Sequence, residues 1–410
     1  MKMIKLKEVL DVKRGASLSG EYYSVSGDKI RLTLGNFCYP NGGFKENTSK
    51  DDIYFIGPVK SEFVLKKGDI ITPLTEQVYG LLGETATIPK DDIYIQSGDV
   101  GLIIVDSEKL YNRYAYYLLP SPIVRKQLGA GAQQTKIRHT SPDKIKDCFA
   151  LIPEMEYQIK AADLLDALNN KISINNSIIS ELESMAKTLY DYWFLQFDFP
   201  DENGKPYKSS GGKMVWNEEL KREIPEGWEI KEFSSIFKFV KGKIPDFLSD
   251  IPTDNYDTPY ITIEVANNAL PQYCNKKGMI ECIGETMIVM DGAASGDVYI
   301  GKTGSLGSTL AKLISQRPDV SNNLIYMIMN SYKSVYKKSN IGSTVPHANR
   351  TYIEKMKIAL PKDNTYYSGQ FDIIYKKIIL VQKENQELAS LRDFLLPMLM
   401  NGQVTFKDLK

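Results

Sequence analysis

The stretch AADLLDALNNKISINNSIISELESMAKTLYDYW, residues 161–193, decides the fold. Apolar side chains recur in it at alternating steps of three and four residues, and no glycine or proline interrupts the run before Pro200. Such spacing over about four heptads predicts a long helix with one narrow apolar seam. The seam positions are Leu165, Leu168, Ile172, Asn175, Ile179, Leu182, Ala186, Leu189 and Trp193.

A second run of nearly the same spacing begins at Phe371 and continues to Pro397. Its seam positions are Phe371, Ile374, Ile378, Val381, Asn385, Leu388, either Leu391 or Arg392, and Leu395. A helix with so narrow an apolar stripe needs a partner helix, so we expect the two runs to pair as an antiparallel coiled coil. The alternative is that each helix lies on its own domain. The polar seam residues Asn175 and Asn385 are expected to fix the register at some cost in stability.

Outward from these helices, the chain repeats itself. An apolar segment runs into a basic residue and a glycine at Arg14-Gly15 and again at Lys241-Gly242. Residues 63–74 resemble residues 279–290, and each reads as a turn into a buried strand. Residues 131–153 parallel residues 342–361, since both pass from a polar loop through a short amphipathic turn to an apolar strand ending in proline.

We therefore predict a mixed α/β protein with a pseudo-twofold internal repeat, in which two globular domains are joined by two long antiparallel coiled-coil helices. The predicted parts are a first domain (1–153), a central helix (154–196), a connector (197–227), a second domain (228–361) and a C-terminal helix (362–410). The connector is rich in Gly, Pro, Ser and charge, so it is expected to be mostly loop. Residues before Leu6 have no safe counterpart, because the first domain lacks a Trp like Trp228.

Composition narrows the functional classes. Lys plus Arg and Asp plus Glu are equal at 51 each, so a nucleic-acid binder would have to gather its basic residues locally. The four cysteines fall at no metal-ligand spacing, and the presence of only two histidines argues against a multi-histidine metal site or a His-based catalytic triad. The apolar runs are too short to span a bilayer, and the thiols fit a reducing compartment, so we expect a cytoplasmic protein with no membrane partner.

One motif suggests a different function. Within SGDVYIGKTG, residues 295–304, the residues Gly296, Gly301, Lys302 and Thr303 match GxxxxGK[ST], the phosphate-binding loop of NTPases. A P-loop NTPase spanning Gly296 to Thr303 is therefore one alternative function.

Three features weaken the NTPase interpretation. Gly304 and Gly307 would fall in the helix that must follow a P-loop, where each costs about 1 kcal/mol relative to alanine. The next apolar run ends in Asn330 rather than in the aspartate that would hold Mg²⁺. The first half has Gly83-Glu84-Thr85 at what reads as the corresponding place. A strand–turn–strand element is favoured, with Lys302 as a candidate contact to a DNA phosphate.

Basic and amide-rich loops recur at matched places in the two halves. Arg and Lys bind phosphates or guanine, and Gln and Asn can read adenine. The candidate DNA-binding residues are Lys13, Arg14, Gln133, Gln134, Lys136, Arg138, His139, Lys241, Lys243, Lys302, Thr303, Ser343, Thr344, His347, Asn349 and Arg350. Taken singly, each is more easily read as an ordinary solvated side chain. Their recurrence in both halves favours a DNA contact for the loops as a class, and the differing side chains suggest two different half-sites.

The chain resembles the specificity subunits of type I restriction-modification enzymes. The resemblance is carried by LESMAKTLYDYWFLQFDFP (182–200), GKPYKSSGGKMVWNEELKREIPEGW (204–228) and SLRDFLLPMLMNGQV (390–404). It implies that each globular half is a target recognition domain reading one part of a bipartite DNA site, and that the paired helices set the spacing.

The same resemblance implies the partners. The subunit would be non-catalytic and would bind double-stranded DNA and two methyltransferase subunits, with restriction subunits in the full complex. It would bind no cofactor itself, because S-adenosylmethionine and ATP/Mg²⁺ belong to the partner subunits. A coiled-coil scaffold or adaptor of a defence system that does not bind DNA is a second alternative.

Overall fold

The computed structural model describes residues 2–38, 42–48, 50–76, 80–130, 138–267, 269–342, 346–404 and 406. The chain divides into two compact units. Unit 1 comprises Met1–Ser173 and Asn385–Lys410, and unit 2 comprises Ile174–Glu384. Each unit has its own apolar core.

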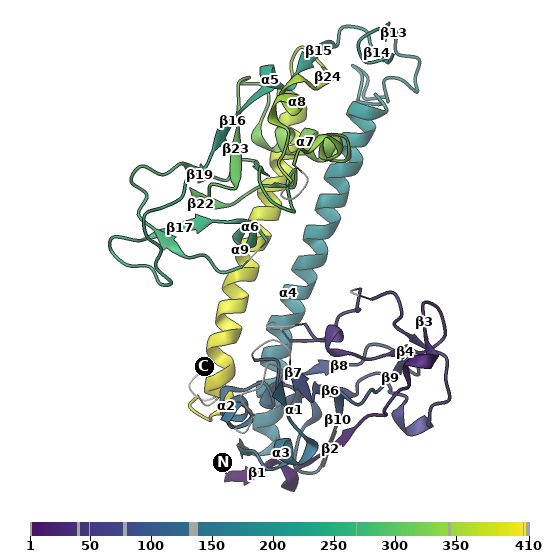
Figure 1. The fold of residues 1–410 in the computed structure, drawn as a ribbon, viewed down its shortest axis with the longest axis vertical. Helices are drawn as coiled ribbons and strands as arrows, with labels where there is room; N and C mark the ends of the chain where they lie inside the picture. Colours follow the sequence, from purple (N-terminus) through teal and green to yellow (C-terminus); the bar gives the residue numbers. More distant parts are fainter. Residues whose placement is uncertain are drawn as a thin grey trace. The chain divides into compact units, whose positions relative to one another are not determined.

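Two long helices are present, as the heptad pattern predicted (Figure 1). The first is α4 (Met155–Tyr190), which ends in a short π-helical turn, Asp191–Leu195. The second is α9 (Thr365–Met400), which contains Pro397 in its last turn. Because α4 begins in unit 1 and ends in unit 2, while α9 does the reverse, each unit contains one half of each helix.

The main sheet of unit 1 has four antiparallel strands in the order β2–β10–β6–β8. They are β2 (Leu10–Arg14), β10 (Val100–Val105), β6 (Ile70–Pro73) and β8 (Ala86–Thr87). Strand β6 is buried at every position, as expected for the strand after the Gly68-Asp69 turn. The remaining elements beside this sheet are β1 (Lys2–Lys5), β12 (Phe149–Ile152), β7 (Thr75–Glu76), β11 (Arg138–His139), α1 (Asn112–Leu118), α2 (Pro122–Ala130) and α3 (Pro142–Lys146).

A smaller lobe of unit 1 is built from very short strands. Its sheet has the order β3–β5–β4–β9 and its own core around Leu32, Phe37 and Leu65. The elements of the lobe are β3 (Tyr23–Ser24), β4 (Ile30–Arg31), β5 (Tyr54–Phe55) and β9 (Tyr94–Ile95), with 3₁₀ turns at Gly20–Tyr22, Leu34–Asn36 and Ser61–Phe63.

The main sheet of unit 2 has the order β16–β23–β20–β21, also antiparallel. These strands are β16 (Phe237–Lys241), β23 (Leu310–Ser315), β20 (Met287–Val289) and β21 (Val298–Tyr299). A second sheet, in the order β18–β17–β22–β19, contains β18 (Tyr273–Cys274), β17 (Thr258–Ile261), β22 (Thr303–Leu306) and β19 (Glu281–Ile283). The other elements are β15 (Glu229–Glu232), β24 (Lys357–Leu360), α5 (Phe233–Ile236), α6 (Ile263–Ala266), α7 (Asn322–Tyr336) and α8 (Arg350–Lys355).

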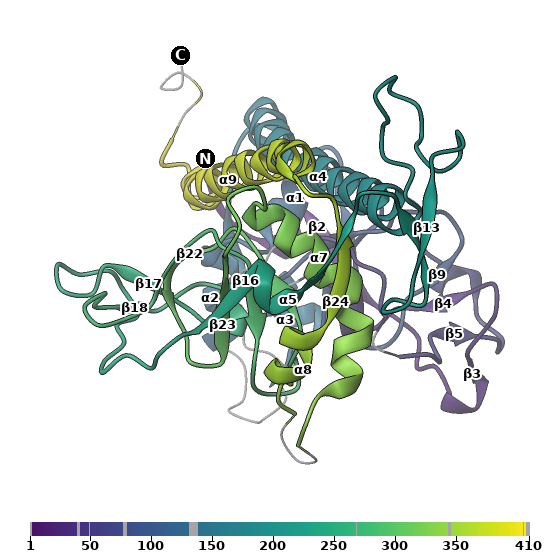
Figure 2. The same cartoon turned by 90° about the horizontal axis from the view of Figure 1, so that it is seen from above.

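Helix α7 packs against both the unit 2 sheet and α9 (Figure 2). Its side chains share one core with β16, β23 and α9, and the Tyr326 ring meets the Tyr375 ring of α9 at 5.4 Å. Ser321 caps the helix by accepting a hydrogen bond from the backbone N–H of Leu324.

The two units confirm the internal repeat. Strands β2, β10, β6 and β8 of unit 1 have the same sheet order as β16, β23, β20 and β21 of unit 2. Strand β1 pairs with β12 as β15 pairs with β24. Residues 2–5 therefore correspond to residues 229–232, a match that sequence comparison had missed for lack of a Trp.

In unit 1, the helix pair packs on the domain as well as on itself. Leu165 and Leu168 of α4 and Leu395 of α9 are buried in one core together with α1. Ile172 and Leu388 are half-buried. The two arrangements treated as alternatives from the sequence therefore both occur, because Leu165 and Leu168 share one core with both α9 and the domain.

In unit 2, the second half of α4 packs against the first half of α9. Ile374, Ile378 and Val381 of α9 are buried, and the α4 seam residues Ile179, Leu182 and Leu189 are half-buried against the same core. The buried amide of Asn175 donates a hydrogen bond to Oε2 of Glu384 at 2.8 Å. Asn385, the other polar seam position, belongs to unit 1 and is half-buried.

A chain of polar contacts ties α4 and α9 to the first domain. Arg113 of α1 donates through Nε to Asp166 Oδ2 at 2.9 Å, and Tyr117 Oη donates to Asp166 Oδ1 at 2.6 Å. Asn169 donates to Tyr117, and Arg392 of α9 donates to Asn169 Oδ1 at 3.1 Å. Arg392, rather than Leu391, is thus the more buried residue of that seam pair, because its guanidinium has an acceptor there.

The connector is more ordered than its composition suggested. It contains the hairpin β13 (Met214–Asn217) and β14 (Arg222–Pro225), joined by a turn in which Lys221 has φ of 51°. The hairpin packs on a small core that includes Phe197, Ile224 and Ala359. The rings of Phe199 and Trp228 stack at 5.1 Å. Aromatic packing supplies the stability that a short hairpin lacks by itself.

Candidate nucleic-acid interface

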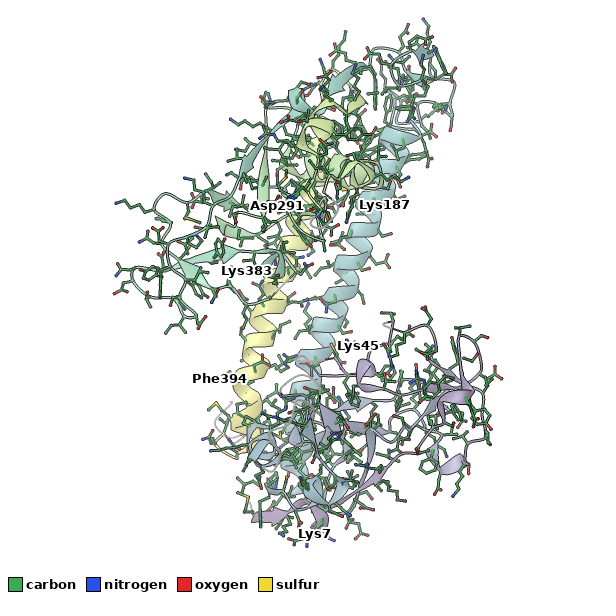
Figure 3. The ribbon with its side chains drawn as sticks, viewed as in Figure 1. Lys7, Lys45, Lys187, Asp291, Lys383 and Phe394 are labelled. Carbon is green, nitrogen blue, oxygen red and sulfur yellow. The ribbon has the colours of Figure 1, made fainter. Side chains whose placement is uncertain are left out.

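A cation, a carboxylate and an imidazole meet at one end of the unit 2 sheet. Lys241, the last residue of β16, places Nζ 2.8 Å from Oδ2 of Asp291. His347 places Nδ1 2.8 Å from Oδ1 of the same carboxylate. Burial raises the pKa of Asp291, but the hydrogen bonds from Lys241 and His347 and the charge of Lys241 outweigh that effect and hold the pKa below its usual value. Asp291, labelled in Figure 3, therefore stays ionised and accepts a hydrogen bond from each of the two side chains.

Backbone hydrogen bonds position this cluster. Strand β20 ends at Val289, and the backbone N–H of Ala348 donates to the carbonyl of the next residue, Met290, at 2.8 Å. His347 is bridged to Asp291 on one side and to Ile341 on the other. The imidazole is thus held at the sheet end by extended backbone on both sides.

Unit 1 has a related cluster at the same end of its sheet. His139 in β11 pairs with Thr75 in β7, and its Nδ1 lies 3.3 Å from Thr75 Oγ1. The Thr75 hydroxyl donates to Oδ1 of Asp99 at 2.9 Å. Arg14, the last residue of β2, donates to the carbonyl of Thr140 at 3.5 Å. Arg138 lies 3.6 Å from the buried carboxylate of Glu76.

The two clusters occupy equivalent places in the repeat. The backbone N–H of Thr140 donates to the carbonyl of Leu74 at 2.9 Å, as Ala348 does to Met290 at 2.8 Å. His139 and His347 immediately precede these two donors. The sequence had matched Arg14 with Lys241, and the structure places both at equivalent strand ends. Arg14 donates to the residue that follows His139, and Lys241 shares the Asp291 carboxylate with His347.

The other described candidates spread over the surface. Lys13 is exposed on β2, and Lys243 donates from Nζ to the carbonyl of Gly278. Asn349 caps α8 by accepting from the backbone N–H of Tyr352, which gives its side chain a structural role. Arg350 pairs with Glu354 at 2.7 Å and lies over the Phe239 ring. The candidates Gln133, Gln134, Lys136, Ser343 and Thr344 lie outside the described residues.

The P-loop interpretation is wrong. Residues 298–306 form β21, a turn and β22, whereas a P-loop needs its lysine and hydroxyl at the start of a helix. Lys302 lies in that turn, half-buried, and burial lowers its pKa. A Cβ on Gly301 would lie 3.6 Å from Cγ1 of Ile379, so the turn packs beside α9. Thr303 begins β22 and is exposed.

The proposed match between Gly83-Glu84-Thr85 and the lysine motif is also wrong. Strand β8 pairs with β6 as β21 pairs with β20, so Glu84 precedes its strand while Lys302 follows its own. Glu84 is buried beside Arg125, and burial raises the pKa of its carboxyl group. Residues 83–85 and 301–303 are similar in sequence but lie at different places in the two domains.

Sequence reasoning missed Thr75, Asp99 and Asp291, the residues that orient the histidines. Thr75 and Asp291 were visible in principle, because each stands seven residues after the glycine of the matched turns at Gly68 and Gly284. Asp99 had no such signal, since it comes from a loop that only the fold brings to Thr75.

Among the described helices, none combines the length and hydrophobicity needed to cross a membrane. Within the described part of the chain, no group of three or more His, Cys, Asp or Glu side chains could hold a metal ion.

Comparison with known proteins places this geometry in a family. The sequence pattern of the "Type I restriction modification DNA specificity domain" matches residues 1–184 and 225–390, which is one copy for each recognition half. The chain is 21% identical to the specificity subunit of the type I restriction enzyme HindI from Haemophilus influenzae, over 85% of this chain and 89% of that one. It is 27% identical to the MjaVIII specificity subunit from Methanocaldococcus jannaschii, in an alignment covering 34% of this chain and only 33% of that relative.

A solved structure shares the fold. The crystal structure of the type I restriction-modification S subunit from M. genitalium superposes with a TM-score of 0.60 at 16% identity, covering 97% of this chain and 96% of that one. The double match to the domain pattern, together with two repeated sheets joined by long helices, shows that the chain belongs to the family of type I restriction-modification DNA specificity subunits.

Proposed function

We propose that the chain reads a bipartite DNA site, with one half-site for each recognition domain. The observation that carries this proposal is the equivalence of the two sheet-end clusters. Each combines a strand-terminal cation, Arg14 or Lys241, with a histidine, but the residue that orients the histidine differs between Thr75 and Asp291. A shared scaffold with different polar groups suits two domains that bind DNA in the same way but read different bases.

The long helices support a role in spacing. Both α4 and α9 have 36 residues, and each contributes packed residues to the cores of both units. Neither helix has a glycine or proline in its interior apart from Gly369 near the start of α9 and Pro397 in its last turn. We infer that the helices fix the number of base pairs between the half-sites.

Exposed apolar side chains on the helices support docking of methyltransferase subunits. On α4 in unit 2, Ile174, Ile178 and Met185 are 57%, 37% and 45% exposed and share one helix face by their spacing. On α9 in unit 1, Phe394 is 63% exposed (Figure 3). Such side chains outside the seam suit amphipathic helices of a partner. We propose that two methyltransferase subunits bind there, with restriction subunits in the full complex, and that S-adenosylmethionine and ATP/Mg²⁺ bind to those partners.

Removing two cations at the unit 1 sheet end tests DNA contact. Changing Lys13 and Arg14 to alanine should weaken binding to all DNA sequences, because phosphate contacts release counterions whatever the bases are. The slope of log affinity against log salt should become shallower by ~1 for each phosphate that the variant no longer neutralises. The measurement is fluorescence anisotropy of labelled duplex across a salt series, with the chain bound to its methyltransferase subunits.

The matched control changes Lys66 and Lys67, an exposed pair in the turn before β6, at the opposite end of that strand. This control should leave the salt slope unchanged. Equal slopes for both double variants and the unaltered protein would show that the sheet-end cluster does not contact phosphates.

A further inference from the structure

The chain has two histidines, and the structure places them at equivalent positions of the two domains. The residue after each histidine donates its backbone N–H to a carbonyl just past the end of a strand. Thr140 donates to Leu74 in one domain, and Ala348 donates to Met290 in the other. Each histidine directs Nδ1 at the residue that follows that carbonyl, Thr75 or Asp291. Because the same arrangement occurs in both domains, the fold that they share sets the orientation of the histidine ring.

The contacts of His139 determine which ring nitrogen carries its proton. Thr75 has one hydroxyl hydrogen, and it donates that hydrogen to Asp99. Thr75 Oγ1 is therefore left to accept from His139, so Nδ1 of the imidazole is the N–H and Nε2 carries the lone pair.

His347 reaches the same state by a different partner. The Asp291 carboxylate is an acceptor only, and it accepts from Nδ1 of His347 while also accepting from Lys241. Nδ1 again carries the hydrogen, and Nε2 of the neutral ring is again the acceptor. The His347 side chain is 46% exposed, and His139 is exposed as well. Among the residues that the structure describes, none makes a hydrogen bond to Nε2 of either ring.

An outward-facing acceptor of fixed orientation selects among bases. In the major groove, hydrogen-bond donors come from the N6 amino group of adenine and the N4 amino group of cytosine, whereas guanine and thymine present acceptors there. Building on the proposed DNA recognition, we propose that Nε2 of His139 and Nε2 of His347 each accept a hydrogen bond from the amino group of one adenine or cytosine in their respective half-sites. The two histidines are then specificity-determining residues at corresponding positions of the two half-sites.

A phosphate contact is the competing role, and its chemistry differs. Phosphate oxygens accept hydrogen bonds, so a histidine could bind one through Nε2 only after that nitrogen is protonated. Such a contact would carry no base preference and would strengthen as the pH falls.

The test uses paired substitutions of each histidine. In His347→Asn the side-chain amide can still donate to Asp291, as Nδ1–H does, but no group remains at the position of Nε2. In His347→Gln the amide reaches the position of Nε2. The same pair is made at His139. Each variant is assembled with its methyltransferase subunits, and methylated adenines are mapped in DNA exposed to the complex.

The expected result is local to one half-site. His347→Asn should lose roughly tenfold of the discrimination at one adenine or cytosine position of the second half-site, as when one base hydrogen bond is removed. The first half-site should keep its full preference and serve as the internal control. His139→Asn should lose discrimination at one position of the first half-site and leave the preference of the second half-site intact. The Gln variants should retain part of the preference, because the amide oxygen can accept.

Three outcomes separate the interpretations. Unchanged preference at every position in both Asn variants, with an intact bipartite motif in the unaltered protein, would overturn the proposal. Uniform weakening on all sequences, with binding by the unaltered protein stronger at about pH 6 than at about pH 8, would assign the histidines to phosphate and overturn it too. Absence of a bipartite motif in the unaltered protein would instead contradict the proposed function itself.

Discussion

Replacing Phe371 with alanine should lower the free energy of unfolding of unit 2 by about 3–5 kcal/mol, the usual cost of removing a fully buried aromatic ring. Phe371 is 0% exposed, and its ring lies 6.0 Å from Trp193 and 6.3 Å from Tyr190. Those rings stand at the end of α4, so the substitution leaves a cavity where the two long helices meet within unit 2. The loss of unfolding free energy should be larger than the loss caused by truncating an exposed side chain next to the helix seam.

The chain allows this effect to be measured in one unit. All three tryptophans, Trp193, Trp216 and Trp228, belong to unit 2, so urea unfolding followed by tryptophan fluorescence reports on that unit. Tyr366→Ala is the matched control, because Tyr366 also contacts Trp193, at 6.0 Å, but is 54% exposed. Similar shifts for the two variants would mean that Phe371 does not anchor the helix pair.

Replacing Gly242 with alanine should be nearly as damaging, costing about 3 kcal/mol or more, at the upper end for overpacking. A Cβ at Gly242 would lie 2.3 Å from the carbonyl oxygens of Leu306 and Gly307, which are backbone atoms of the neighbouring strand and loop. These atoms cannot move without breaking the sheet, so the strain falls on β16 and on the Lys241 cluster at its end.

The repeat supplies a companion variant. A Cβ at Gly15 would lie 2.3 Å from the carbonyl oxygen of Ser97, in the equivalent position of unit 1. Gly15→Ala should therefore destabilise unit 1 while leaving the tryptophan-detected transition in place. Gly369→Ala in α9 meets nothing within 4 Å and should stabilise unit 2 by about 1 kcal/mol. If Gly242→Ala leaves the unfolding free energy of unit 2 unchanged, the close approach of residue 242 to Leu306 and Gly307 is not required for stability.

The long helices and the main strands could be predicted, because their physical signals are local. Heptad spacing marks α4 and α9 whatever surrounds them, and a Gly-acid turn before an apolar run marks β6 and β20. Because the chain contains an internal repeat, each of these patterns occurs twice in the sequence. Two-residue strands such as β3 and β5 carry no period at all, so no sequence pattern could place them.

The site could be predicted only in part. Arg14, Lys241, His139 and His347 stood out by residue type and by repetition, but their orienting partners come from segments distant in the chain. Asp99 and Thr75 are 24 residues apart, and Asp291 and His347 are 56 apart. The hairpin β13–β14 was missed for a different reason, since the aromatic packing that stabilises it was invisible in a composition typical of loops.

The most direct test of bipartite recognition is the map of methylated adenines. The chain is assembled with its methyltransferase subunits, exposed to DNA of random sequence, and the modified sites are aligned. We predict two half-sites of different sequence separated by a constant number of unspecified bases, because two domains of one design are joined by continuous helices. A single contiguous motif, or methylation without sequence preference, would contradict this prediction.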